Sequence, residues 1–462
     1  MQNRRTTWFG HIKQMLCIGI GSVLAGVLLL TLVFCIPVGV MARHVGASVD
    51  KILVESPEPS DGWLKQYIYE KKESYTDAIM VQNAIEKIPG KNAYEHAMWA
   101  YHLDLDAEVW TPEVSVEYFS KGGDTSVMFL HQYSRYWHGY LVYLKPLLLL
   151  FTWEQILWIG GALQVLLFLV VLIVSFKSGH PEVGIALLLS LLFMKPLLML
   201  VSLDMAVCWL ITLIAVLAIL LKYDWLKRKE HFPELFLMTG ILVAYFDFLT
   251  YPVVTLGFPL CVFFLMKDRR KPEHRLYTME VRGTAFFLSE NLGGLLENVG
   301  QMLAYSACWA LGYVSMWAAK WVVADLTLHA GTIKSAFSSI LGWTEAIGGR
   351  PRVSGGFYVI SLNLQEYDFW IYPFLIVLVT LFDVAAFVYA SKKTSLKEAI
   401  SLCVPYLLTA CIPFGWYVVV QHHSGLHVSF TFRIISVAWL ALCAIGLGLF
   451  CLGRKETAIS DG

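Results

Sequence analysis

The sequence predicts an all-α protein that crosses a membrane about ten times. Of its 462 residues, 57% are hydrophobic and only 15% are charged, and the mean hydropathy is +0.60. Soluble domains carry about 25% charged residues. The apolar residues gather in long runs, as membrane-spanning helices require, because the backbone must satisfy its own hydrogen bonds in lipid. We therefore expect one polytopic membrane domain over residues 1–462.

Apolar runs give ten candidate spans. They cover residues 15–41, 153–175, 182–201, 203–222, 234–250, 252–267, 302–324, 369–391, 399–420 and 431–452. The first run follows Arg4, Arg5 and Lys13, as the apolar region of a signal peptide would. It is longer than such a region, however, and no clear A-x-A cleavage site follows it. We interpret it as a retained first helix.

Basic residues mark alternate turns between the candidate spans. If the N-terminus is cytoplasmic, the cytoplasmic turns hold Lys222, Lys227, Arg228 and Lys229, then Lys267, Arg269, Arg270, Lys271 and Arg275, then Lys392, Lys393 and Lys397, and finally Arg454 and Lys455. The opposite short turns, around Asp204, Asp247 and 421–430, contain no lysine or arginine. This distribution follows the positive-inside rule. It predicts cytoplasmic N- and C-termini in a cell membrane, which we expect to be the bacterial plasma membrane.

Two long segments, 42–152 and 325–368, then lie on the extracytoplasmic side. Residues 42–139 hold nine basic and fifteen acidic side chains. Helical spacing of apolar residues in Thr76–Ile88 predicts a short amphipathic helix. Aromatic residues flanked by cations within 135–151 predict an interfacial helix at the membrane surface, and a cytoplasmic counterpart is expected near 276–298.

Three carboxylates on the extracytoplasmic side, Asp77, Asp204 and Asp247, are the candidate catalytic residues. A carboxylate at a membrane border is costly unless it meets water, a partner or a substrate. Asp77 opens the predicted helix, where a capping box with Ser74 explains it equally well. Asp204 lies in a very short turn and could instead cap the following helix. Asp247 could simply form the turn before Pro252, although its aromatic neighbours would raise its proton affinity.

The last outer turn, Gln421–Arg433, is rich in hydrogen-bond donors and free of acids. We call it the histidine turn. Its candidate phosphate-binding residues are His422, His423, His427 and Arg433, and arginine can offer two parallel donors to a phosphate. Interfacial histidines beside a snorkelling arginine are the alternative interpretation.

A metal site in the histidine turn is less favoured than a phosphate site. His423 and His427 have the four-residue spacing of a helical metal pair. However, Gly425 argues against a continuous helix, and no nearby carboxylate completes the ligand set. Lys320, on the outward half of a candidate span, could snorkel to the surface or meet an anionic lipid head group, so it joins the candidate phosphate-binding residues.

Composition excludes other functions. The formal net charge is zero, and its distribution shows no footprint for nucleic acid. All nine cysteines lie in or beside apolar runs, and none belongs to a CxxC pair. We therefore expect neither a disulfide framework nor a cysteine metal site.

The layout of these features resembles the GT-C superfamily of integral-membrane glycosyltransferases. The resemblance covers most of the chain and lies in the order of a first helix, a long outer loop with an acid, an interfacial helix, a second acid in a short outer turn and late basic turns. It implies an enzyme that moves a sugar from a polyprenyl-phosphate carrier to an extracytoplasmic glycan or lipid acceptor. By this resemblance, Asp77 is the first-loop catalytic aspartate, Asp204 is the second acid, and the histidine turn binds the carrier phosphate.

The chain departs from the GT-C pattern in one motif. No DxD or EDE stands at the first-loop acid, although Asp104-Leu-Asp106 has the DxD form further along. A divalent cation is therefore neither required nor excluded as a cofactor. Membrane lipids are expected partners. Two other functions also stay open. Asp383 and Lys195, within or near apolar runs, favour a transporter or flippase of lipid-linked glycans, and a non-enzymatic scaffold of envelope assembly would tolerate loss of all three acids.

Overall fold

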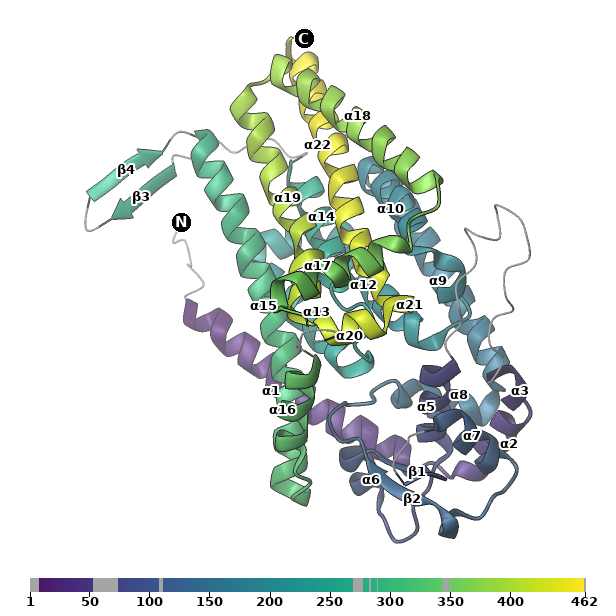
Figure 1. Ribbon diagram of the computed structural model, residues 1–462. Coiled ribbons are helices and arrows are strands. Elements are labelled where there is room, and N and C mark those ends of the chain that lie inside the picture. Colours follow the sequence, from purple (N-terminus) through teal and green to yellow (C-terminus); the bar gives the residue numbers. More distant parts are fainter. Residues whose placement is uncertain are drawn as a thin grey trace.

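The computed structural model describes residues 8–52, 74–107, 111–268, 277–281, 284–288, 290–343, 348 and 350–460. These residues are predominantly helical and contain only two short antiparallel hairpins, β1–β2 and β3–β4 (Figure 1). Six of the described helices are long and apolar enough to cross a membrane. The predicted class, an all-α multi-pass membrane protein, is thereby confirmed.

The principal helices coincide with the predicted apolar runs. The long apolar ones are α1 (Trp8–Phe34), α9 (Trp153–Lys177), α12 (Leu203–Lys229), α18 (Ile371–Lys393), α19 (Leu396–Val419) and α22 (Ser436–Ser460). The remaining runs form α10 (Pro181–Met194), α13 (Phe232–Phe246), α14 (Val254–Asp268) and α15 (Glu290–Leu328).

Four helices, α12, α14, α18 and α22, run parallel through the bundle, and the first three end in basic residues at the same end. Their contacts show this. Gly257 near the start of α14 faces Val437 near the start of α22, and Leu265 near the end of α14 faces Gly448 of α22. Tyr223 near the end of α12 stacks on Phe263 of α14, with 5.9 Å between ring centroids. In α18, Tyr389 near the C-terminus packs on Phe450 of α22.

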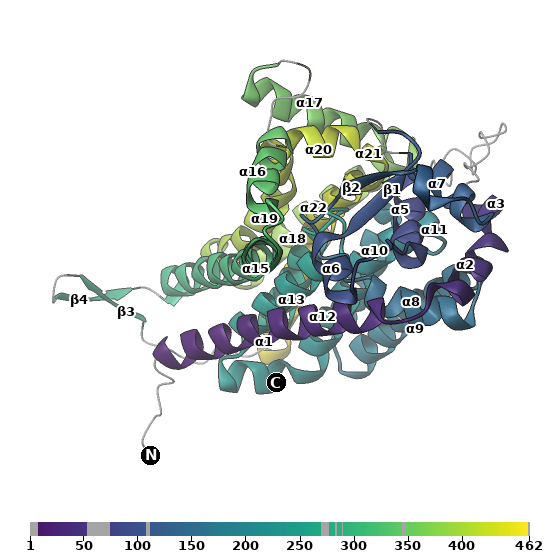
Figure 2. The ribbon, with the colours of Figure 1, turned by 90° about the horizontal axis from the view of Figure 1, so that it is seen from below.

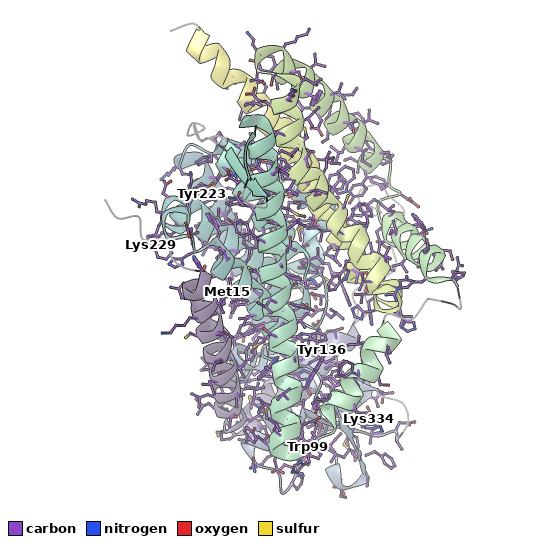
Figure 3. The ribbon with its side chains drawn as sticks, turned by 90° about the vertical axis from the view of Figure 1, so that its left-hand side faces the viewer. Met15, Trp99, Tyr136, Tyr223, Lys229 and Lys334 are labelled. Carbon is purple, nitrogen blue, oxygen red and sulfur yellow. The ribbon has the colours of Figure 1, made fainter. Side chains whose placement is uncertain are left out.

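The basic C-terminal turns of these helices therefore gather away from the acidic turns. They contain Lys227, Arg228 and Lys229 of α12, Lys267 of α14, and Lys392 and Lys393 of α18. Figure 3 shows Tyr223 and Lys229 in the upper half of the view and Trp99 and Lys334 near the bottom. The predicted basic residues Arg4, Arg5, Arg269, Arg270, Lys271 and Arg275 lie outside the described residues.

Proline sets two helix ends that the apolar runs placed wrongly. The run 15–41 is interrupted because Pro37 has no N–H for the helical ladder, and a separate helix, α2 (Val38–Gly46), follows. The run 182–201 is interrupted at Lys195, which has a φ of 44° before Pro196. The short α11 (Pro196–Met199) comes next.

The cytoplasmic interfacial helix expected near 276–298 is also wrong. The segment forms β3 (Tyr277–Val281) and β4 (Thr284–Leu288), and only its last residues belong to α15. The error has a local cause, because β-branched and aromatic residues, which favour strand over helix, make up three of the five residues in each strand.

The first long loop folds into a small unit at the end of the bundle where α1 finishes (Figure 2). Its further elements are α3 (Val49–Ile52), α5 (Ser74–Ile85), α6 (Ala93–Trp99), β1 (Tyr101–Asp104), α7 (Pro112–Ser120), a 3₁₀ turn (Thr125–Val127), β2 (Phe129–Gln132) and α8 (Leu141–Leu150). β1 pairs antiparallel with β2, Tyr101 opposite Gln132.

Two predictions for this loop need correction. α5 forms where a helix is predicted, but it is not amphipathic, because every residue from Asp77 to Ile85 is buried. The aromatic segment before α8 does not lie open at a membrane surface either: Tyr136, Trp137 and Tyr140 are at most 6% exposed. Both segments form the interior of the outer unit.

The second long loop is also helical. It forms α16 (Thr332–Trp343) and α17 (Arg352–Gln365), and these helices contact the histidine turn. The histidine turn itself consists of α20 (Gln421–Leu426), α21 (Val428–Thr431) and the start of the 3₁₀ turn Phe432–Ile435. All these elements lie at the end of the bundle opposite the basic helix termini (Figure 1).

Candidate functional site

Asp204 and Asp247 lie close together at the end of the bundle that holds the outer unit. Asp204 belongs to the first turn of α12, and Asp247 follows the last residue of α13. The negative charge of Asp204 helps to raise the pKa of Asp247. Both charges also raise the pKa of Tyr143 on α8, although burial of the phenol is the larger cause. Two of the three predicted acids therefore share one site with a tyrosine that the sequence did not indicate.

Asp247 is held by its own turn. Its carboxylate accepts hydrogen bonds from the backbone N–H of Thr250 at 2.9 Å and from the Thr250 hydroxyl at 2.5 Å. Burial nevertheless raises the pKa of Asp247 to about 6, and the Thr250 donors only partly oppose this. The same turn holds Leu249 at a φ of 67°, which is costly for a side chain branched beyond Cβ. Burial thus moves the pKa of Asp247 towards neutral pH.

Asp204 does not cap α12 as the sequence allowed. Ser202 occupies the N-cap position, and its hydroxyl donates a hydrogen bond to Oδ1 of Asp204 but accepts none from the backbone N–H groups of the helix. The carboxylate of Asp204 is 5% exposed and lies in the first helical turn, where the helix dipole favours a negative charge. The first turn of α12 and the Ser202 hydroxyl therefore hold the Asp204 carboxylate in place beside Asp247.

Asp77 lies within the outer unit. It is 1% exposed on α5, which contacts both α8 and α12, the helices that carry Tyr143 and Asp204. The predicted capping pair involves the side chain of Ser74, which lies outside the described residues. The catalytic role of Asp77 stays a prediction.

The histidine turn is bonded directly to the turn that holds Asp247. Nε2 of His423 lies 2.9 Å from the carbonyl oxygen of Leu249. Burial lowers the pKa of His423 to about 3, so the neutral ring donates its Nε2–H to this carbonyl. His427 packs on His423 with 4.6 Å between ring centroids. His422 is half-buried and is more accessible to a ligand than His423.

Arg433 is fully buried and bonded to backbone carbonyls. Nη1 donates to the carbonyl of Ser429 at 2.8 Å, and Nη2 lies 3.5 Å from the carbonyl of Lys195. The guanidinium lies over the ring of Phe432, and the ammonium of Lys195 lies over the same ring. Lys195 also pairs with Glu366 at 3.2 Å. The guanidinium of Arg433 is therefore fixed by these carbonyls. It supplies positive charge near the site but does not present two unoccupied donors to a phosphate.

Tyr251 is influenced by both the acidic and the basic groups. Its hydroxyl donates to the carbonyl of Met205. Burial raises the pKa of Tyr251, the charges of Asp247 and Asp204 raise it further, and the charge of Arg433 lowers it. The acids and Arg433 thus act on one phenol, which places them in the same part of the molecule.

The side chains of Lys320 and Asp104 are held by contacts within the protein. Lys320 is fully buried, donates to the carbonyl of Ala97 at 2.6 Å and lies over the ring of Trp137, so it fastens α15 to the outer unit. Asp104 accepts hydrogen bonds from the backbone of Asp106 and from both the backbone and the hydroxyl of Thr111. The hydrogen bonds within this loop account for Asp104, and the phosphate-binding role of Lys320 stays a prediction.

The aromatic segment 133–143 forms a wall of the site. Phe248, next to Asp247, packs on Tyr140 with 4.8 Å between ring centroids, and the N–H of Gly139 donates to the carbonyl of Tyr245. A side chain on Gly139 would overlap Tyr245, so only glycine allows this approach. From the sequence alone, these aromatic residues were predicted to lie at the membrane surface. Their position beside the acids was therefore not predicted.

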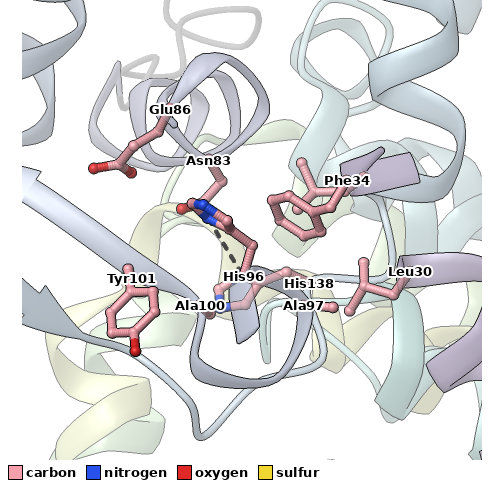
Figure 4. Close-up of a pocket in the computed structure, with 10 residues that line it drawn as sticks. Leu30, Phe34, Asn83, Glu86, His96, Ala97, Ala100, Tyr101 and His138 are labelled. Atoms are coloured by element: carbon pink, nitrogen blue, oxygen red, sulfur yellow. Dashed lines mark hydrogen bonds between the residues drawn. The ribbon is translucent and has the colours of Figure 1, made fainter. Parts of the chain in front are cut away.

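A buried polar cluster holds this wall against the outer unit (Figure 4). Asn83 of α5 donates to the hydroxyl of Tyr140 at 2.7 Å and lies 3.4 Å from Nδ1 of His138. Glu86 accepts a hydrogen bond from the backbone of Leu103, and burial raises its pKa well above the usual value. These groups line a small cavity enclosed by α1, α5 and α6. Their contacts position the segment that faces Asp247.

No protein family, curated protein or solved structure matches the chain. Within the described residues, no group of three histidine, cysteine, aspartate or glutamate side chains is arranged to hold a metal ion. None of the nine cysteines, all of which lie within the described residues, forms a disulfide.

Proposed function

We propose that this protein is a membrane glycosyltransferase of the GT-C type that uses a polyprenyl-phosphate-linked sugar. The supporting observation is the acid pair Asp204–Asp247, bonded through Leu249 to a turn that carries histidines and Arg433. One carboxyl of the pair changes protonation near neutral pH, as a general base must. The neighbouring cationic and donor groups suit a departing phosphate.

In the proposed reaction, Asp247 takes the proton of an acceptor hydroxyl while that oxygen forms a bond to the anomeric carbon. The bond between the anomeric carbon and the carrier phosphate breaks, and its electron pair leaves with the polyprenyl phosphate. Asp204 stays ionised and stabilises the positive charge that develops on the sugar ring. Arg433 contributes long-range positive charge, and His422 is the accessible donor for the phosphate. The acceptor is an extracytoplasmic glycan or lipid.

The proposed orientation places this site outside the cytoplasm. Lysine and arginine gather at the helix ends opposite the acids, and such residues favour the cytoplasmic side. The arrangement then has ten spans, with α10, α13, α14 and α15 completing the six long apolar helices, and both termini in the cytoplasm. The bacterial plasma membrane is the proposed location.

A transporter of lipid-linked glycans is the second candidate, and one residue favours it. Asp383 lies inside the apolar helix α18 and packs against Gly446 of α22. Ionisable residues within spans mark many transport pathways. The acid pair, by contrast, lies at the helix ends, where a transporter has no evident use for it.

Loss of Asp204 tests the proposal. Membranes that contain the protein would receive a radiolabelled polyprenyl-phosphate sugar, and label transferred to an acceptor would be measured. Asp204→Asn should reduce transfer at least about tenfold, because the charge beside the reacting centre is lost. Asp368→Asn, an exposed acid near the same end, is the matched control and should leave transfer unchanged. Equal activity of both variants would contradict the proposal.

Transfer should also depend on pH through Asp247. A base acts only when deprotonated, so with a pKa of about 6 the rate should be nearly constant above pH 7 and fall about tenfold per pH unit below 6. The pH profile of transfer at saturating donor checks this. A rate that stays level down to pH 4.5 would exclude Asp247 as the base.

A further inference from the structure

Two helices beside the site expose apolar stripes that no described residue covers. On α16 the stripe consists of Ile333, Phe337 and Leu341, and on α17 of Val353, Phe357 and Leu364, with exposed fractions between 37% and 69%. The spacings of four and seven residues put each stripe on one face of its helix. The opposite faces are buried through Ala336 on α16 and Val359 on α17. Both helices are therefore amphipathic, with the apolar side outward.

The pair is firmly attached to the protein by polar contacts. Asp325 at the end of α15 accepts hydrogen bonds from the first N–H groups of α16, at Thr332 and Ile333. The hydroxyl of Thr332 donates to that of Ser134, beside the aromatic wall. On α17, Asn363 donates to the carbonyl of Ser424 in the histidine turn. The stripes thus face outward from a fixed support that touches two sides of the candidate site.

The charges around the two apolar stripes indicate what covers them. Lys334, Arg350 and Arg352 are exposed around the stripes, and the only acid in the sequence between 329 and 365 is Glu345. An amphipathic helix that combines an apolar face with cations binds the boundary between acyl chains and anionic head groups. The stripes also lie at one end of the apolar helices that meet lipid, so the lipid surface is continuous with them.

We propose that α16 and α17 are embedded in the leaflet on the acid-bearing side of the membrane. Acyl chains cover the two stripes, and the phosphates of anionic lipids meet Lys334, Arg350 and Arg352. The pair then forms the lipid-facing wall beside the histidine turn. This docking surface does not depend on the transferase activity, so it can fail or hold independently of it.

Photo-crosslinking in nanodiscs tests the docking surface. A benzoylphenylalanine would replace Phe337, Phe357 or, as a control, the exposed Lys121 of the outer unit, in discs with equal parts of phosphatidylglycerol and phosphatidylcholine. Mass spectrometry should find lipid adducts at positions 337 and 357, several-fold above position 121. Adducts at 337 and 357 no higher than at 121, or adducts to another polypeptide in native membranes, would overturn the proposal.

The role of the cations is measured in the same discs. Adducts at 337 should favour phosphatidylglycerol, because each cation near a membrane surface strengthens binding to anionic lipid about fivefold. Reversing the three charges (Lys334→Glu, Arg350→Glu, Arg352→Glu) should abolish the preference while total adducts remain. An unchanged preference would refute the assignment of the head-group contacts.

Discussion

Asp247→Asn is expected to reduce sugar transfer about 10²- to 10⁴-fold, the usual contribution of a general base. The substitution removes the proton acceptor and leaves the turn intact. The amide oxygen of asparagine can still accept the hydrogen bond from the N–H of Thr250, and its NH2 group can donate to the hydroxyl oxygen of Thr250 in place of the bond that Oδ1 accepts. The bond from His423 to the carbonyl of Leu249 involves only backbone on that side, so it also persists.

The measurement is the initial rate of transfer at saturating donor, with expression and thermal stability compared in parallel. Thr250→Val provides the complementary variant: it removes one donor to Asp247, so the pKa of the carboxyl should rise and the pH profile shift towards higher pH. If Asp247→Asn folds normally and keeps at least half of the wild-type rate, Asp247 is not the base.

Gly312→Val is expected to destabilise the bundle by about 1–3 kcal/mol or more, because it forces two helix backbones apart. α13 and α15 cross at Gly240 and Gly312. A side chain on Gly312 would overlap the carbonyl oxygen of Leu237, and one on Gly240 would overlap the carbonyl oxygen of Trp309. Small residues allow such close approach between membrane helices. Asp247 directly follows α13. The crossing of α13 and α15 therefore also fixes the position of Asp247 in the acid pair.

Gly300→Val is the matched control for this prediction. Gly300 lies on the same helix, and nothing comes within 4 Å of a side chain placed there. Both substitutions put a β-branched residue into α15, so helix propensity affects them alike. The midpoint of thermal unfolding in detergent should fall clearly for Gly312→Val and little for Gly300→Val. Equal midpoints would mean that the helices do not cross as described.

The sequence predicted helix class and position well because the bilayer imposes long apolar runs. It placed helix ends poorly where a single residue decides, as at Pro37 and Lys195. It also misassigned amphipathic character. The described part of α5 is buried on all sides within the outer unit, whereas α16 and α17, inside what the sequence showed only as a second loop, carry the exposed apolar stripes.

The candidate site was only partly predictable. Asp204 and Asp247 were recognised because acids in short turns of an apolar chain are conspicuous, yet their proximity depends on how α12 packs against α13. Arg433 was recognised as a cation, but sequence could not show that backbone carbonyls already hold its guanidinium. Tyr143 and Tyr251 carried no signal, since each is one aromatic residue among many.

The most direct test of the central claim is reconstitution of the purified protein in liposomes with a radiolabelled polyprenyl-phosphate sugar. We predict that wild-type protein releases polyprenyl phosphate and forms a labelled glycan or glycolipid, and that Asp204→Asn and Asp247→Asn variants do not. The opposite result would be movement of the intact labelled lipid across the bilayer, equal in wild type and both variants and without cleavage of the bond between sugar and phosphate. That outcome would contradict the transferase and leave the transporter.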